Sequence, residues 1–193
     1  RLMSNIVLKG STSGDVTITV PAEAGTNTLT LPAGTGNIIT STTAGTTIQT
    51  VNVQTGALAT GTTRMPLDDT IPQKTEGDEY MTLAITPTNA SNKLKIEVVF
   101  IGTDTAVQTF VAAIFQDSTA GALAVGACVN SNQHGIECLN VNHYMTAGTT
   151  NATTFKVRAG GNNSGTTTFN GQQGARRYGG SFASSITITE IAV

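Results

Sequence analysis

The stretch Leu94-Lys-Ile-Glu-Val-Val-Phe-Ile101 decides the fold class of this chain of 193 residues. Its apolar side chains recur at every second position, residues 94, 96, 98 and 100. The residues between them are charged at first, Lys95 and Glu97, and apolar afterwards, Val99 and Ile101. A period of two is that of a β-strand, because successive side chains point to opposite faces. We therefore expect a strand that is half-exposed where it begins and buried where it ends.

Similar patterns on both sides of this stretch predict more strands. In residues 81–86 Met, Leu and Ile alternate with Thr and Ala. Residues 107–115 and 122–129 are largely apolar runs, which fit buried strands or one short helix. We expect further strands over 136–144, 153–158 and 182–191, separated by segments rich in Gly, Asn, Ser and Pro. About seven or eight short strands at this spacing predict an all-β fold, with a jelly-roll-like β-sandwich over residues 64–193.

The composition excludes several classes of function. Only 11% of the residues are charged, whereas the chain contains 36 threonines and 21 glycines. Ten basic residues are too few for the dense patch that a nucleic-acid surface needs. No apolar run approaches the ~18 residues of a membrane-spanning helix. We therefore expect no nucleic-acid partner and no membrane insertion.

Residues 1–63 differ in composition from the rest of the chain. They contain no aromatic residue, Cys or His. Two alternating stretches, Val16-Thr-Ile-Thr-Val20 and Thr28-Leu-Thr-Leu31, are each followed by Pro-Ala and then by Gly-Thr. One thin apolar stripe per strand is too little for a core, but neighbouring chains can complete it. This predicts an intertwined shaft of three chains over residues 5–40, with a flexible Thr/Gly linker as the alternative, while 41–63 fits either.

Three segments resemble the tail-fibre proteins of bacteriophages. The segment from Val16-Thr-Ile-Thr-Val-Pro-Ala22 through Leu29-Thr-Leu-Pro-Ala-Gly-Thr-Gly36 is similar to their shaft repeats. Ile85-Thr-Pro-Thr-Asn-Ala-Ser-Asn-Lys-Leu-Lys-Ile96 is similar to the segment that opens their C-terminal head, and Ser185-Ile-Thr-Ile-Thr-Glu-Ile191 to their usual ending. The resemblance implies a homotrimeric virion protein with a β-shaft or linker over 1–63 and a receptor-binding head over 64–193.

The same resemblance implies the partners and the location. The partners are further copies of the chain, other tail or baseplate proteins, and a bacterial surface glycan or outer-membrane receptor. The location is the virion, which is extracellular after assembly in the host cytoplasm. Two alternatives remain: a capsid fibre or decoration protein without a receptor, and, less favoured, a hydrolase that degrades surface polysaccharide.

Two polar segments of the expected head are candidate ligand sites. The first is glycine-rich and carries Arg176, Arg177 and Tyr178. Guanidinium groups suit carboxylates and phosphates, and a phenol ring packs against sugar faces. An arginine pair that bridges to a neighbouring subunit is an equally good interpretation. The second segment lies between two expected strands and offers adaptable hydrogen-bonding groups, Asn130, Asn132 and His134.

Other chemistry-bearing residues favour neither a metal nor catalysis. Cys128, His134, Cys138 and His143 are soft ligands, but zinc sites usually bring ligands in close pairs. The acidic residues Asp68, Asp69, Glu76, Asp78 and Glu79 lack the alternating spacing of a calcium loop. Nothing in their spacing supports the paired carboxylates of a glycosidase. We expect no metal, no cofactor and no enzymatic activity. We expect Cys128 and Cys138 to be two neighbouring buried thiols rather than a disulfide.

Overall fold

The computed structural model describes residues 6–9, 15–18 and 43–193, and the chain divides into two units, residues 1–38 and 39–193. In the first unit β1 (Ile6–Lys9) pairs antiparallel with β2 (Asp15–Ile18). β2 confirms the strand expected in the first alternating stretch. The strand expected over residues 28–31 lies outside the described residues. The three-chain shaft stays a prediction.

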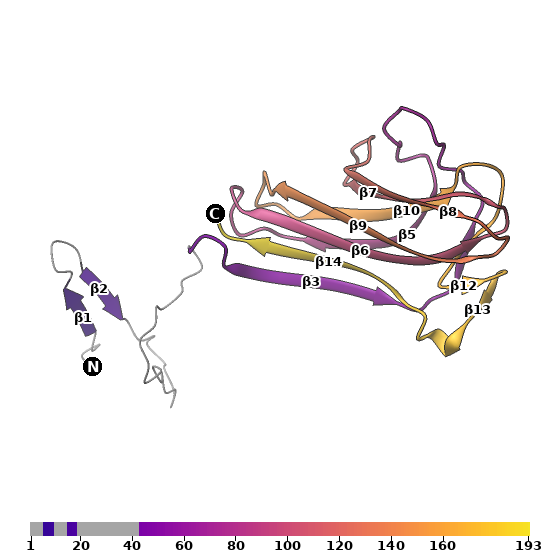
Figure 1. The fold of residues 1–193 in the computed structure, drawn as a ribbon. Coiled ribbons are helices and arrows are strands. Elements are labelled where there is room, and N and C mark those ends of the chain that lie inside the picture. Colours follow the sequence, from indigo (N-terminus) through magenta and orange to yellow (C-terminus); the bar gives the residue numbers. More distant parts are fainter. Residues whose placement is uncertain (1–5, 10–14, 19–42) are drawn as a thin grey trace. The chain divides into compact units, whose positions relative to one another are not determined.

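Residues 43–193 form a sandwich of two antiparallel sheets (Figure 1). Its strands are β3 (Thr47–Thr55), β4 (Ala59–Gly61), β5 (Asp78–Ile85), β6 (Lys93–Asp104), β7 (Gln108–Gln116), β8 (Ala124–Asn130), β9 (Ile136–Thr146), β10 (Thr153–Gly161), β11 (Thr167–Phe169) and β14 (Ser184–Ile191). One sheet has the order β5-β10-β7-β8. The other has the order β3-β14-β6-β9, and β4 and β11 continue β3 and β14 toward the end of β6. This is the strand order of a jelly roll, so the expected sandwich is confirmed.

The sandwich begins earlier than the expected boundary at residue 64. β3 pairs with β14 and β4 pairs with β11, so residues 47–61 form one edge of a sheet. Val51 and Val53 of β3 pack against the core, while the residues between them face solvent. An edge strand with one solvated face needs only one apolar stripe. A stretch without charges or aromatic residues therefore belongs to the sandwich and not to the shaft or linker.

The core confirms the alternation that the sequence predicts for β6. Leu94, Ile96, Val98 and Phe100 are at most 1% exposed. The Phe100 ring packs against three other aromatic rings, those of Tyr80, Phe110 and Phe169. The centroids of the contacting rings in this group lie 5.0–5.8 Å apart. Tyr80 joins this group through a β-bulge, because Met81 pairs with Val157 and Glu79 pairs with Arg158, which leaves Tyr80 unpaired.

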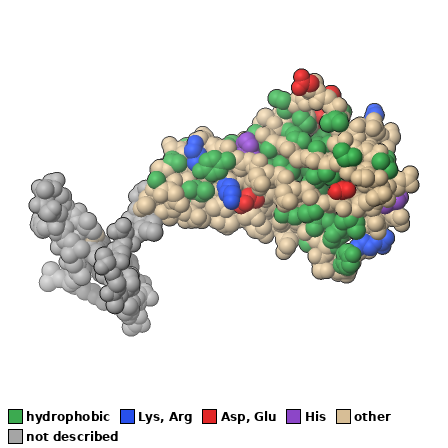
Figure 2. Space-filling view, in the orientation of Figure 1, with side chains coloured by type: hydrophobic (Ala, Val, Ile, Leu, Met, Phe, Trp, Pro, Cys, Tyr) green, Lys and Arg blue, Asp and Glu red, His purple; other side chains and the backbone are tan. Residues whose placement is uncertain are grey.

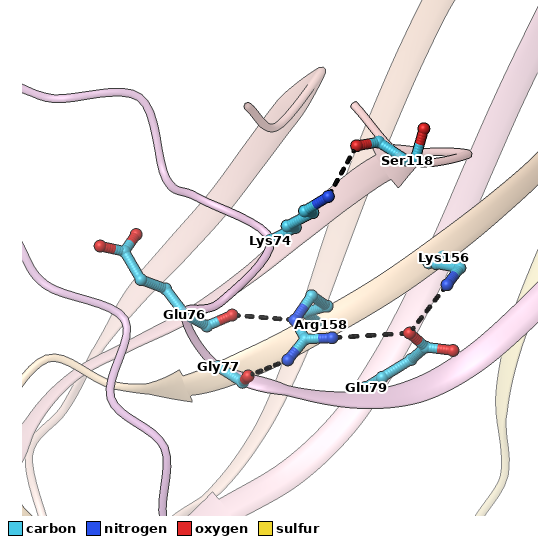
Figure 3. Close-up of polar contacts among 7 residues, drawn as sticks. All are labelled: Lys74, Glu76, Gly77, Glu79, Ser118, Lys156 and Arg158. Atoms are coloured by element: carbon cyan, nitrogen blue, oxygen red, sulfur yellow. Dashed lines mark hydrogen bonds and ion pairs between the residues drawn. The ribbon is translucent and has the colours of Figure 1, made fainter. Parts of the chain in front are cut away.

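Residues 62–77 form a strap that covers the outer face of the β5-β10-β7-β8 sheet. Met65 is fully buried against outward-facing side chains of β7, Val111, Ala113 and Phe115. Arg158 donates from Nε to the Glu76 carbonyl (3.0 Å) and from Nη2 to the Gly77 carbonyl (2.7 Å), as Figure 3 shows. The strap thereby buries both faces of β7. This explains why residues 110–115 are continuously apolar, and the segment forms a strand and not a helix.

We expect Arg158→Ala to loosen the strap. Two carbonyls lose their donors, so the free energy of unfolding falls by about 1–2 kcal/mol, and the strap becomes a better thermolysin substrate. Urea denaturation and limited proteolysis measure both effects. Lys156→Ala is the matched control, because Lys156 makes only a half-exposed ion pair with Glu79 (3.4 Å), which is worth at most about 0.5 kcal/mol. Equal losses in the two variants contradict this role of Arg158.

Candidate site at the distal end of the sandwich

The sandwich has one end where the chain enters and another where most of the sequence-predicted site residues lie. At the entry end, Gly45 N donates to Ala192 O (2.9 Å), and β6 begins beside Ile191. β6 ends at Asp104, at the opposite end. We call this opposite end, made of loops 105–107, 131–135 and 162–166 and of residues 171–183, the distal end. No helix among the described residues is long and apolar enough to cross a membrane.

Asp104 fixes three distal loops relative to one another. It is 1% exposed, and its Oδ1 accepts from Ala106 N (2.9 Å) and Gln108 Nε2 (2.6 Å). Its Oδ2 accepts from Thr167 Oγ1 (3.1 Å), and its main-chain oxygen accepts from His134 N (2.8 Å). A buried carboxylate whose oxygens all accept hydrogen bonds holds the surrounding segments in place. The distal loops therefore stand on a rigid base.

Residues 171–183 leave the sheet between β11 and β14, and we call them the excursion. They contain β12 (Gly171–Gln172), β13 (Ala175–Arg176) and the 3-10 turn η1 (Tyr178–Gly180). Side chains of Asn170 and Ser184 close its neck: Ser184 Oγ donates to Asn170 Oδ1 (2.7 Å) and accepts from Ile101 N (2.8 Å). Asn170 Nδ2 also donates to Thr55 O (2.7 Å). Both neck residues are fully buried, so the excursion rises from a fixed base.

Gln172 joins the two segments that the sequence singles out. Its Nε2 donates to the His134 carbonyl (2.9 Å), and its Oε1 accepts from Arg177 Nε (3.3 Å). The structure thus brings loop 131–135 and the excursion into one surface. Sequence reasoning did not find Gln172, because nothing local marks a glutamine whose two partners lie in different loops.

The excursion displays the three residues expected of it. Tyr178 is 74% exposed and its ring meets Phe182 edge-on, with centroids 5.7 Å apart. Arg176 is exposed and Arg177 half-buried, and within the described part of the chain neither makes an ion pair. The Arg176 side chain lies over η1, since a Cβ on Gly180 would stand 3.3 Å from Arg176 Nη1.

Loop 131–135 contributes less than the sequence suggests. Asn130 is fully buried, its Nδ2 lies 3.4 Å from Ala106 O, and its Oδ1 accepts from Asn132 N (3.3 Å). It shapes the loop and does not face a ligand, which corrects the expectation for this residue. Asn132 is exposed. His134 is half-buried with a φ of 60°, and its carbonyl is already bonded to Gln172.

The cysteines and the clustered acids lie in separate surroundings among the described residues. Both cysteines are free: Cys128 is half-buried against the core, but Cys138 is exposed on β9, so the expected pair of buried thiols is wrong for Cys138. Burial, followed by the charge and hydrogen bond of Glu137, raises the pKa of the Cys128 thiol to about 12. The acids have separate partners, for example Thr70 for Asp68, Thr63 for Asp78 and Arg158 for Glu79.

This chain is distantly similar to two solved structures. No protein-family model and no curated protein matches it. The structure of Eiger TNF from S. frugiperda matches 74% of this chain and 93% of its own, at 10% identity and a TM-score of 0.43. The VP2 subviral particle of infectious bursal disease virus matches 84% of this chain and 43% of its own, at 11% identity and a TM-score of 0.32. At these values the likenesses assign neither a family nor a function.

Proposed function

We propose that this chain is a non-enzymatic structural protein of a virion, the distal part of a phage tail fibre that attaches to a bacterial surface. One observation carries the proposal: the rigidly based excursion and loop 131–135 are joined through Gln172 at the end of the sandwich opposite to chain entry. Variable loops held on a rigid sandwich suit the contact of a fibre with a cell surface. The tail-fibre resemblance of the three sequence segments supports the same placement.

The proposed attachment is multivalent. The jelly roll is a common framework of both viral and lectin domains, in which variable loops sit on a rigid sandwich. Three copies in one trimer place three equal sites on one particle, so the second and third contacts form at high effective concentration. Attachment strength then arises from avidity, and no single contact needs to be tight.

The solution mass of the chain and its binding to bacteria test this proposal together. We expect a mass of three chains by light scattering, and binding of the fluorescent chain to some strains of a bacterial panel. A monomer that binds no strain contradicts the proposal. A trimer that binds no strain favours the capsid-fibre alternative, and release of reducing ends from surface polysaccharide favours the hydrolase.

A further inference from the structure

We propose that the excursion binds an anionic sugar, with Arg176 and Arg177 on its carboxylate or phosphate group and Tyr178 against its ring. This inference rests on the proposed attachment function and names the class of ligand. It is carried by two guanidinium groups that make no ion pair among the described residues and by one strained, exposed tyrosine, at adjacent positions of the excursion.

The charge at this site is uncompensated. Elsewhere in the described sandwich Lys95, Lys156 and Arg158 have carboxylate oxygens within 3.5 Å, whereas Lys74 and Lys93 bond only the neutral oxygens of Ser118 and Thr146. Arg176 has no carboxylate partner among the described residues, and Arg177 uses only its Nε, on the neutral Gln172. Figure 2 shows basic and hydrophobic side chains side by side where Figure 1 draws β12 and β13. The chain as a whole has a net charge of -2, so these arginines are a local positive site on a nearly neutral protein.

Tyr178 is held in an unfavourable backbone conformation. Its φ is 50°, in the left-handed region, where an aromatic residue is strained. Ser181 fixes it there, with N and Oγ donating to the Tyr178 carbonyl at 3.1 and 2.7 Å. The edge-on contact with Phe182 leaves Tyr178 74% exposed. Strain that is held in place by surrounding bonds, on a large exposed apolar ring, indicates a contact surface and not a structural need.

These groups match the chemistry of an acidic sugar. A guanidinium group presents planar N–H donors that bind carboxylate or phosphate oxygens two at a time. Since Gln172 holds Arg177 by Nε, its terminal nitrogens stay available. The Tyr178 ring offers a flat face to the C–H groups of a pyranose. Exposed Asn132, on the loop joined to the excursion, adds an amide for sugar hydroxyls.

Binding of defined oligosaccharides to the full chain tests the inference. The carboxylate probe is oligogalacturonate, its methyl ester is the neutral control with the same stereochemistry, and the phosphate probe is an oligophosphomannan. We expect at least one anionic probe to bind about tenfold or more tightly than the methyl ester, and raising NaCl from about 50 to about 500 mM to weaken it. Which anionic probe binds decides between the two sources of charge.

Two double variants complete the test. Arg176→Gln/Arg177→Gln is expected to lose about tenfold or more of the affinity for that probe, whereas Lys93→Gln/Lys95→Gln, at the entry end, keeps it. Equal binding of ester and acid, no binding of either anionic probe, or an unchanged arginine variant overturns the inference. Cell binding by the wild type with any of these results leaves the attachment function standing. If the arginine variant no longer has the mass of a trimer, the inference is also overturned, because the arginines then bridge subunits and do not bind a sugar.

Discussion

Replacing the excursion, residues 171–183, by a short Gly-Ser linker is expected to abolish attachment to cells and to leave the sandwich folded. The neck makes this replacement feasible, because the Asn170 and Ser184 side chains are already 2.7 Å apart. β11 and β14 keep their partners on β6 and on the β3–β4 edge. In a trimer all three sites disappear together, so we expect cell binding to fall by about a hundredfold or more.

Cell binding of the labelled chain and thermal unfolding measure the two halves of this prediction. We expect the Tm to change by only a few degrees, which corresponds to about 1 kcal/mol in a domain of this size. The matched control replaces residues 149–152, an exposed turn between β9 and β10 at the entry end, by a linker of equal length. Attachment that survives loss of the excursion, or disappears equally in the control, refutes the assignment of the site to the distal end.

The fold was predictable from the sequence where one face of a strand is buried and the other is solvated. Alternation predicts β6 and β14 well, because burial follows it residue by residue. It does not distinguish a strand from a helix in β7, since the strap covers that strand's second face. It also does not assign β3 to the sandwich, because the hydrogen bonds from β3 to β14 join residues more than 120 positions apart.

The candidate site was predictable only as a set of residue types. Arg176, Arg177 and Tyr178 have the chemistry of a ligand site, and in the structure Arg176 and Tyr178 are exposed and Arg177 is half-buried. Asn130 has similar chemistry, but its burial under loop 105–107 reverses its role. The neck at Asn170 and Ser184 and the hydrogen bonds of Gln172 depend on contacts between segments distant in sequence. Local sequence patterns therefore do not predict them.

Glu190→Ala is expected to cause the largest loss of stability, about 3 kcal/mol. Glu190 is fully buried at the entry end, where its Oε1 accepts from Thr88 N and Oγ1 (both 2.8 Å) and Asn92 Nδ2 (2.7 Å). Its Oε2 accepts from Gln49 Nε2 (2.7 Å). Alanine leaves these donors without an acceptor and opens a cavity beside them. Glu190→Gln keeps one acceptor oxygen and the volume, so we expect a smaller loss in urea denaturation at pH 7.

The pH dependence of stability separates the charge of Glu190 from its shape. Burial would raise the pKa of Glu190, but the hydrogen bonds from Gln49, Asn92 and Thr88 outweigh burial and hold it below its ordinary value of 4.5. A carboxyl group with a lowered folded-state pKa stabilises the protein above its unfolded-state pKa. That stabilisation is lost as the pH falls through the lower, folded-state pKa. We therefore expect the wild type to have the larger free energy of unfolding at pH 7, and the difference from Glu190→Gln to shrink as urea denaturation is repeated down through about pH 4. A difference between wild type and Glu190→Gln that is the same at every pH contradicts a role for the charge, because glutamine carries none.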